Sequence, residues 1–178
     1  MSDHADTPVR LFFAVMPDRG ARGRLEALAT DTAERAGGRP SAPDTLHLTV
    51  VFIGTVAGKA VATVREAGDV LRCDRFTLAL DALGSFRRAG IAWAAPGRTP
   101  LALERAHREL TAALATRGIA PEARPFRPHV TLARRCARPV EGTIDPPIAW
   151  SVDDVVLMSS RLLSEGARYE PIAHWRTR

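Results

Sequence analysis

The chain has 178 residues, 46% of them hydrophobic and 25% charged, which is enough for one domain with a core of its own. No apolar stretch approaches the roughly 20 residues of a membrane helix, and the opening "MSDHADTPVR" lacks a signal peptide's apolar segment, so we expect a cytoplasmic protein without membrane contacts. The net charge of +5 suits an anionic partner such as RNA, although an arginine-rich and alanine-rich composition also arises from GC-rich coding.

The predicted elements alternate between strands and helices. After a mobile tail at residues 1–8, the apolar segment 9–17 predicts a buried strand. Asp18 then caps a helix that Gly37 and Gly38 end. The remaining segments follow the same reasoning: strands at 46–54, 75–86, 89–96, 126–135, 151–163 and 167–175, helices at 61–72 and 101–117, and a proline-rich link at 138–147.

This order predicts an α+β fold, because the hairpins between consecutive strands do not fit a purely parallel sheet. We expect one domain over residues 1–178. The two cysteines, Cys73 and Cys136, have neither the number nor the spacing of a zinc site or a disulfide framework. We interpret them as reduced thiols, and a single pairing between them stays open.

The sequence writes one short core twice, as "LHLTV" at 46–50 and "PHVTL" at 128–132. Side chains alternate faces along a strand, so His47 and Thr49 share one face, and His129 and Thr131 share one face of the other strand. The 82-residue spacing of the two cores, close to half the chain, makes an internal duplication plausible. Two such faces brought together would place two imidazoles and two hydroxyls around one cavity.

That set suits phosphodiester cleavage. Histidine titrates near neutral pH, so one imidazole can act as a base while the other acts as an acid. Threonine hydroxyls can hold phosphate oxygens without adding charge. A lone strand histidine is more often structural, and imidazole also binds zinc, but no third ligand stands at a metal-site spacing from either core. The repeated core favours catalysis without a metal or other cofactor.

The chain resembles the 2H phosphoesterases, and among them the RNA 2',3'-cyclic phosphodiesterases formerly called 2'-5' RNA ligases. The resemblance covers nearly the whole chain. It rests on "RLFFAVMP", "LHLTVVFIG", "FTLALDALGSF" with Trp93, "FRPHVTLAR", and "VVLMSS" with Tyr169 and Trp175. Val50 and Ile53, where leucine is frequent, are conservative departures.

The resemblance implies two pseudo-symmetric lobes, each an antiparallel sheet with helices, facing each other across a central cleft. It implies metal-free hydrolysis of a terminal 2',3'-cyclic phosphate on RNA or a nucleotide to a 2'-phosphate. Our hypothesis makes His129 the base and His47 the acid, although the sequence does not fix which is which. Thr49 and Thr131 would hold phosphate oxygens.

Arg134 is a further candidate for a phosphate contact. Its strand parity is opposite to that of His129, so it reaches the site only if the strand twists, bulges or ends there. Arg127 is a weaker candidate of the same kind. Phe12 and Phe52 could stack a base, but a core role is the better prediction for both.

His4, His107 and His174 receive no catalytic role. Three alternatives stay open: another activity of the same superfamily (2'-5' RNA ligase or phosphodiesterase, or ADP-ribose cyclic phosphate phosphodiesterase), a non-catalytic module that binds RNA ends, and a metal-dependent hydrolase. We expect a monomer.

Overall fold

A computed structural model describes residues 7–163 and 166–177. Most of the predicted mobile tail, with His4, lies outside the described residues. Within those ranges no helix is long and apolar enough to cross a membrane. Cys73 is buried, Cys136 is partly buried, and both are free thiols.

Three α-helices and nine strands, together with three short 3-10 turns, make up the regular structure of the described residues. The helices are α1 (Arg19–Ala36), α2 (Val61–Gly68) and α3 (Leu101–Ala115). The strands are β1 (Val9–Val15), β2 (Arg39–Pro40), β3 (Leu48–Val56), β4 (Phe76–Phe86), β5 (Ile91–Ala95), β6 (Val130–Arg134), β7 (Gly142–Val152), β8 (Asp154–Leu163) and β9 (Gly166–Arg176). The α+β class predicted from the sequence is confirmed.

The strands form one antiparallel sheet in the order β7-β4-β5-β6-β3-β1-β8-β9, with β2 added beside β6. Most neighbouring strands pair over five or more residues, whereas β3 and β6 pair only through Leu48 and Val130. The sheet therefore consists of two halves joined at one residue pair: β7, β4, β5, β6 and β2 form one, and β3, β1, β8 and β9 form the other. We propose that the two lobes expected from the sequence correspond to these halves.

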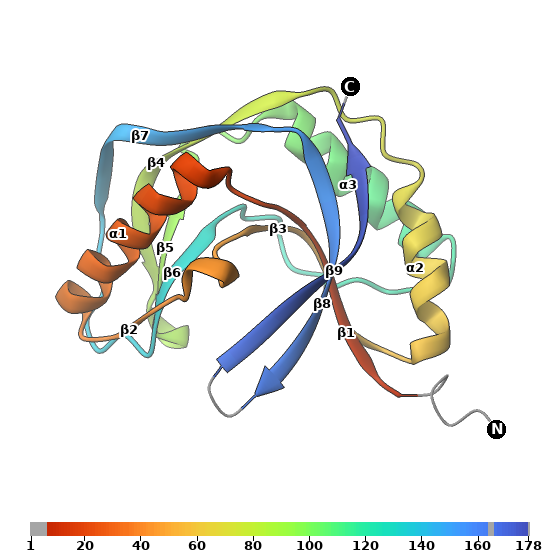
Figure 1. Ribbon diagram of the computed structural model, residues 1–178, viewed down its shortest axis with the longest axis horizontal. Coiled ribbons are helices and arrows are strands. Elements are labelled where there is room, and N and C mark those ends of the chain that lie inside the picture. The colour runs from red at the N-terminus through yellow and green to blue at the C-terminus, as the bar shows by residue number, and fades with distance from the viewer. Residues whose placement is uncertain (1–6, 164–165, 178) are drawn as a thin grey trace.

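A helix covers each half of the sheet: α1 covers the half that contains β6, and α3 covers the half that contains β3 (Figure 1). Helix α1 precedes β3 in the sequence but packs on β6, β2, β7 and β5 of the other half, and α3 precedes β6 but packs on β3. Asp18 caps α1 by accepting a hydrogen bond from the Ala21 amide at 2.8 Å, and Gly37 ends it at φ 63°. Both predicted ends of this helix are thus confirmed.

The main core lies between the helices and the sheet, and its largest fully buried side chains include Phe13, Leu48 and Leu132. A smaller cluster lies on another part of the molecule and contains Phe12 and Met158 with Tyr169 packed against it. Some side chains of this smaller cluster also line the cleft described below. The sheet is therefore apolar toward the helices and mixed toward the cleft.

The segment predicted as a proline-rich link is wrong as a link, because most of it forms β7. Strand β7 pairs only with β4, so it is an edge strand, where a proline without an N–H is tolerated. Residues 148–152 of β7 pair with β4, and so do residues 142 and 143. The ladder is broken between these two stretches, where Pro146 and Pro147 lie. Arg24 of α1 donates hydrogen bonds to the two proline carbonyls at 2.6 and 2.8 Å, which satisfies these acceptors where the ladder is broken.

Candidate active site

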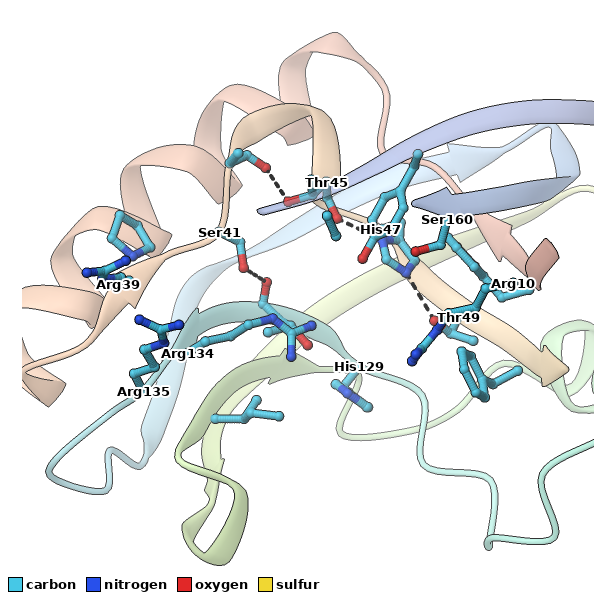
Figure 2. Close-up of a pocket in the computed structure, with 18 residues that line it drawn as sticks. Arg10, Arg39, Ser41, Thr45, His47, Thr49, His129, Arg134, Arg135 and Ser160 are labelled. Atoms are coloured by element: carbon cyan, nitrogen blue, oxygen red, sulfur yellow. Dashed lines mark hydrogen bonds between the residues drawn. The ribbon is translucent and has the colours of Figure 1, made fainter. Parts of the chain in front are cut away.

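The single pair that joins the two halves of the sheet also brings the two His-x-Thr cores together. An antiparallel pair has local two-fold symmetry, and the axis through Leu48 and Val130 relates His47 to His129 and Thr49 to Thr131. Leu48 and Val130 are fully buried. Their neighbours in each strand project from the opposite face, so all four polar side chains line one cleft (Figure 2).

Both imidazoles are oriented by the same backbone contact. Nδ1–H of His47 donates to the Thr45 carbonyl at 2.7 Å, and Nδ1–H of His129 donates to the Arg127 carbonyl at 2.7 Å. In each ring Nε2 is therefore the nitrogen left to exchange a proton in the cleft. The Thr49 hydroxyl lies 3.1 Å from Nε2 of His47, and it can donate to that nitrogen while the imidazole is neutral.

His47 is enclosed by aromatic rings. The ring centroids of Phe12 and Tyr169 lie 4.8 and 5.1 Å from that of His47, and Tyr169 meets it edge to face. Burial in this setting lowers the pKa of His47 to about 4; the Thr45 hydrogen bond opposes this, and the charges of Arg134 and His129 lower the pKa further.

His129 packs edge to face on Phe86, with ring centroids 5.0 Å apart. Burial lowers its pKa as well, the hydrogen bond to the Arg127 carbonyl opposes this, and the positive charge of Arg134 adds to the decrease. Both histidines are thus held neutral near pH 7 in the free protein. A bound phosphate anion would raise both pKa values and allow the pair to share one proton.

The low pKa of His47 has a consequence for stability. Between pH 6.5 and about pH 4 this histidine is protonated in the unfolded chain but neutral in the folded chain. The free energy of unfolding therefore decreases as the pH is lowered through this window. The shift corresponds to about 3 kcal/mol. We therefore expect His47→Asn to lose clearly less stability than the wild type between pH 7 and pH 4 in urea unfolding. Equal losses in the two proteins would contradict a depressed pKa.

Arg134 lines the cleft although simple alternation places it on the other face. Thr131 pairs with Trp93, but Ala133 pairs with the next residue of β5, Ala92, so Leu132 is an extra residue in β6. Leu132 and Ala133 are both buried as a result, and Arg134 returns to the face of Thr131. The sequence analysis expected Arg134 to reach the cleft only if its strand twists, bulges or ends, and β6 has such a bulge.

The cleft has a volume of about 700 Å³. Its lining residues include four arginines (Arg10, Arg39, Arg134 and Arg135) and no aspartate or glutamate. An anion is therefore the ligand that its charge favours. In the described residues no group of three or more His, Cys, Asp or Glu side chains could share a metal ion.

The other residues named from the sequence fall into three groups. Phe12 is buried and Phe52 is partly buried, yet both also line the cleft; the guanidinium carbon of Arg10 lies 4.8 Å from the Phe52 ring centroid. Arg127 supplies its carbonyl to His129, while its exposed side chain is not part of the lining. His107 lies outside the cleft lining, where it donates to the Val50 carbonyl and stacks on Phe126.

The lining residues to which the sequence assigned no site role include Arg10, Arg39, Arg135, Ser160 and Tyr169. Three of them had a signal, and one of the three, Tyr169, is among the residues that carry the family resemblance. Arg10 has the parity of Phe12 in β1, and Arg135 lies in the basic run around the second core. Arg39 and Ser160 had no signal, because their approach to the cleft depends on how β2 and β8 pair.

An α+β fold with two His-x-Thr strands that meet at one cationic cleft is characteristic of one class of proteins, the two-histidine phosphoesterases. The chain belongs to the 2'-5' RNA ligase superfamily, whose family model matches residues 17–162.

Characterised relatives agree with this placement. The RNA 2',3'-cyclic phosphodiesterase of Escherichia coli is 34% identical over 172 residues, which cover 94% of this chain and 96% of that protein. The RNA 2',3'-cyclic phosphodiesterase of Aeropyrum pernix is 34% identical over 63% of this chain and 66% of its own length. The crystal structure of Escherichia coli LigT complexed with 3'-AMP superposes with a TM-score of 0.87 at 28% identity, covering 96% of this chain and 98% of that one.

Proposed function

We propose that this protein is a hydrolase that opens 2',3'-cyclic phosphates at the ends of RNA or nucleotides and leaves a 2'-phosphate. The observation that carries the proposal is the pair of Nε2 atoms presented to one cleft by His47 and His129, each fixed by an Nδ1–H bond to a backbone carbonyl. The family placement and the relatives, which are RNA 2',3'-cyclic phosphodiesterases, support the same reaction.

In the proposed reaction a water oxygen attacks phosphorus as the P–O3' bond breaks. His129 takes the proton of the water, and His47 gives a proton to the departing 3'-oxygen, so that one water is consumed and a 3'-hydroxyl and a 2'-phosphate result. The pKa of about 4 for His47 in the free protein implies that this residue gains its proton when the substrate's negative charge enters the cleft.

The remaining site residues would stabilise charge. We propose that the hydroxyls of Thr49 and Thr131 donate to the two non-bridging phosphate oxygens, and that Arg134 offsets the negative charge that builds on them. Thr131 is held in place because Ser41 donates to its carbonyl at 2.8 Å. Both halves of the site come from one chain, which supports a functional monomer. A cytoplasmic location stays a prediction from the sequence.

Phosphorus-31 NMR tests the proposal directly. A nucleoside 2',3'-cyclic phosphate incubated with the protein in excess EDTA should give a 2'-phosphate signal, because the proposed proton transfers need only the two histidines. The control is a protein with both His47→Ala and His129→Ala. Turnover that EDTA abolishes would show a metal-dependent hydrolase, and binding without turnover of this compound or of a short RNA with the same end would show a non-catalytic module.

A further inference from the structure

Three arginines, Arg39, Arg134 and Arg135, line one end of the cleft, and Arg39 and Arg135 lie on the far side of Arg134 from the histidines (Figure 2). Arg39 of β2 pairs directly with Arg134 of β6, and Arg135 follows in the chain. All three side chains are exposed and line the cleft. In the parts of the chain described, none of their guanidinium groups has an ion-pair or hydrogen-bond partner.

Two features of this end cost stability. Like charges directly opposite each other in an antiparallel pair repel, and Arg39 with Arg134 is such a pair. Arg135 has φ 56° and is the only non-glycine residue with positive φ among those described. Such a conformation is unfavourable for an arginine and persists only where neighbouring structure enforces it.

Neighbouring structure does enforce it. After Arg135, the amide of Cys136 donates to the Gly90 carbonyl at 3.0 Å, and the amides of Ala137 and Arg138 donate to the Ala36 carbonyl at 2.9 Å. On the other side, Gly38 fits tightly: a Cβ there would lie 2.8 Å from the Arg134 carbonyl oxygen. The backbone on both sides of the arginine cluster is thus fixed before any ligand binds.

We propose that Arg39 and Arg135 form a second phosphate subsite, which takes the backbone phosphate on the 5' side of the terminal nucleotide. This inference rests on the proposed function and deepens it. Thr131 and Arg134 pair with Trp93 and Ile91, two residues apart on β5, or about 7 Å along a strand. The Arg134 charge acts on both histidines, whereas Arg39 and Arg135 lie farther along the cleft (Figure 2). An anion at this end would offset the repulsion between the paired arginines. The preferred substrate is then an oligonucleotide end rather than a mononucleotide.

A dinucleotide ending in a 2',3'-cyclic phosphate tests this when its internal linkage is either an ordinary phosphodiester or a neutral methylphosphonate. In the wild type we expect kcat/KM to be about tenfold higher for the charged linkage, the usual scale of a charge-assisted hydrogen bond. In a protein with Arg39→Gln and Arg135→Asn the ratio should fall to about one. Asparagine suits the second position because it tolerates positive φ.

Arg108→Gln is the matched control, since it removes one exposed arginine of α3 that does not line the cleft, and its ratio should equal that of the wild type.

The two cleft substitutions should also raise the melting temperature of the free protein by removing repulsion and strain. A purely structural role for these arginines would lower it.

A wild-type ratio near one, or a tenfold ratio kept by the double variant, overturns the subsite while leaving the proposed function intact. If the wild type hydrolyses neither dinucleotide nor a mononucleotide, the proposed function has failed instead. In that case the subsite is tested by binding, with the same two dinucleotides ending in a 2'-phosphate. The charged linkage should bind about tenfold more tightly than the neutral one to the wild type, and equally tightly to the double variant. ATP added to the dinucleotide assay serves as a free polyphosphate probe. Inhibition of the wild type that the double variant lacks, with the dinucleotide ratio unchanged, would assign the arginines to a free polyphosphate and contradict an RNA phosphate.

Discussion

Replacing either His47 or His129 with alanine should lower kcat/KM for a 2',3'-cyclic phosphate by about three orders of magnitude or more. Each imidazole presents its Nε2 to the same cleft from a ring fixed at Nδ1, and no other described histidine lines that cleft. Water can replace an acid or a base only poorly. The double variant should therefore be little worse than either single variant, because the two residues act in one step.

The roles of the two histidines separate with a substrate whose 3'-oxygen is replaced by sulfur. A thiolate leaves without being protonated, so this substrate removes the need for the acid but not for the base. We expect it to restore much of the activity of His47→Ala and little of that of His129→Ala. The opposite pattern would exchange the two roles while keeping the two-histidine mechanism.

His174→Ala is the matched control for these variants. His174 is exposed, donates from Nδ1 to Asp154 at 2.8 Å, and does not line the cleft. It should keep wild-type kcat/KM. Far-UV circular dichroism and melting temperatures would show whether the two cleft variants are folded. Small and equal losses from His47→Ala and His129→Ala in folded proteins would show that the cleft binds its ligand without catalysis.

The site could be predicted from the sequence where a strict alternation of side chains held. His47 and Thr49 straddle the buried Leu48, and His129 and Thr131 straddle the buried Val130, so parity alone gave the polar face of each core. The pairing between the two cores could not be predicted. It depends on one residue pair between strands 82 positions apart, for which no local pattern exists.

The fold was predictable where apolar segments were long and cleanly capped, as in α1 and β1. It was not predictable in β7, where Pro146 and Pro147 indicated a link, because an edge strand can break its ladder and resume it. The two-residue β2 has no periodicity to detect. Its place beside β6 is set by the tight turn at Gly37 and Gly38, and this turn brings Arg39 into the cleft.

Arg134 combines both situations, because its chemistry was predictable and its geometry was not. Alternation from His129 places it on the wrong face, and the extra residue Leu132 restores it to the cleft. There its charge lies close enough to add to the lowering of the pKa of both histidines by burial. A cation in this position can stabilise negative charge that develops on the phosphate.

We therefore expect Arg134→Gln to lower kcat by about a hundredfold, the loss typical of removing one donor to a developing oxyanion. Arg134→Lys should recover part of this, since a lysine keeps the charge but loses the forked geometry. The substitution should also raise the pKa of both histidines, measurable by NMR titration of their ring protons, because a neighbouring positive charge has been removed. A variant with wild-type kcat and unchanged histidine titrations would place the Arg134 guanidinium away from the reacting phosphate and return that residue to the exposed basic surface.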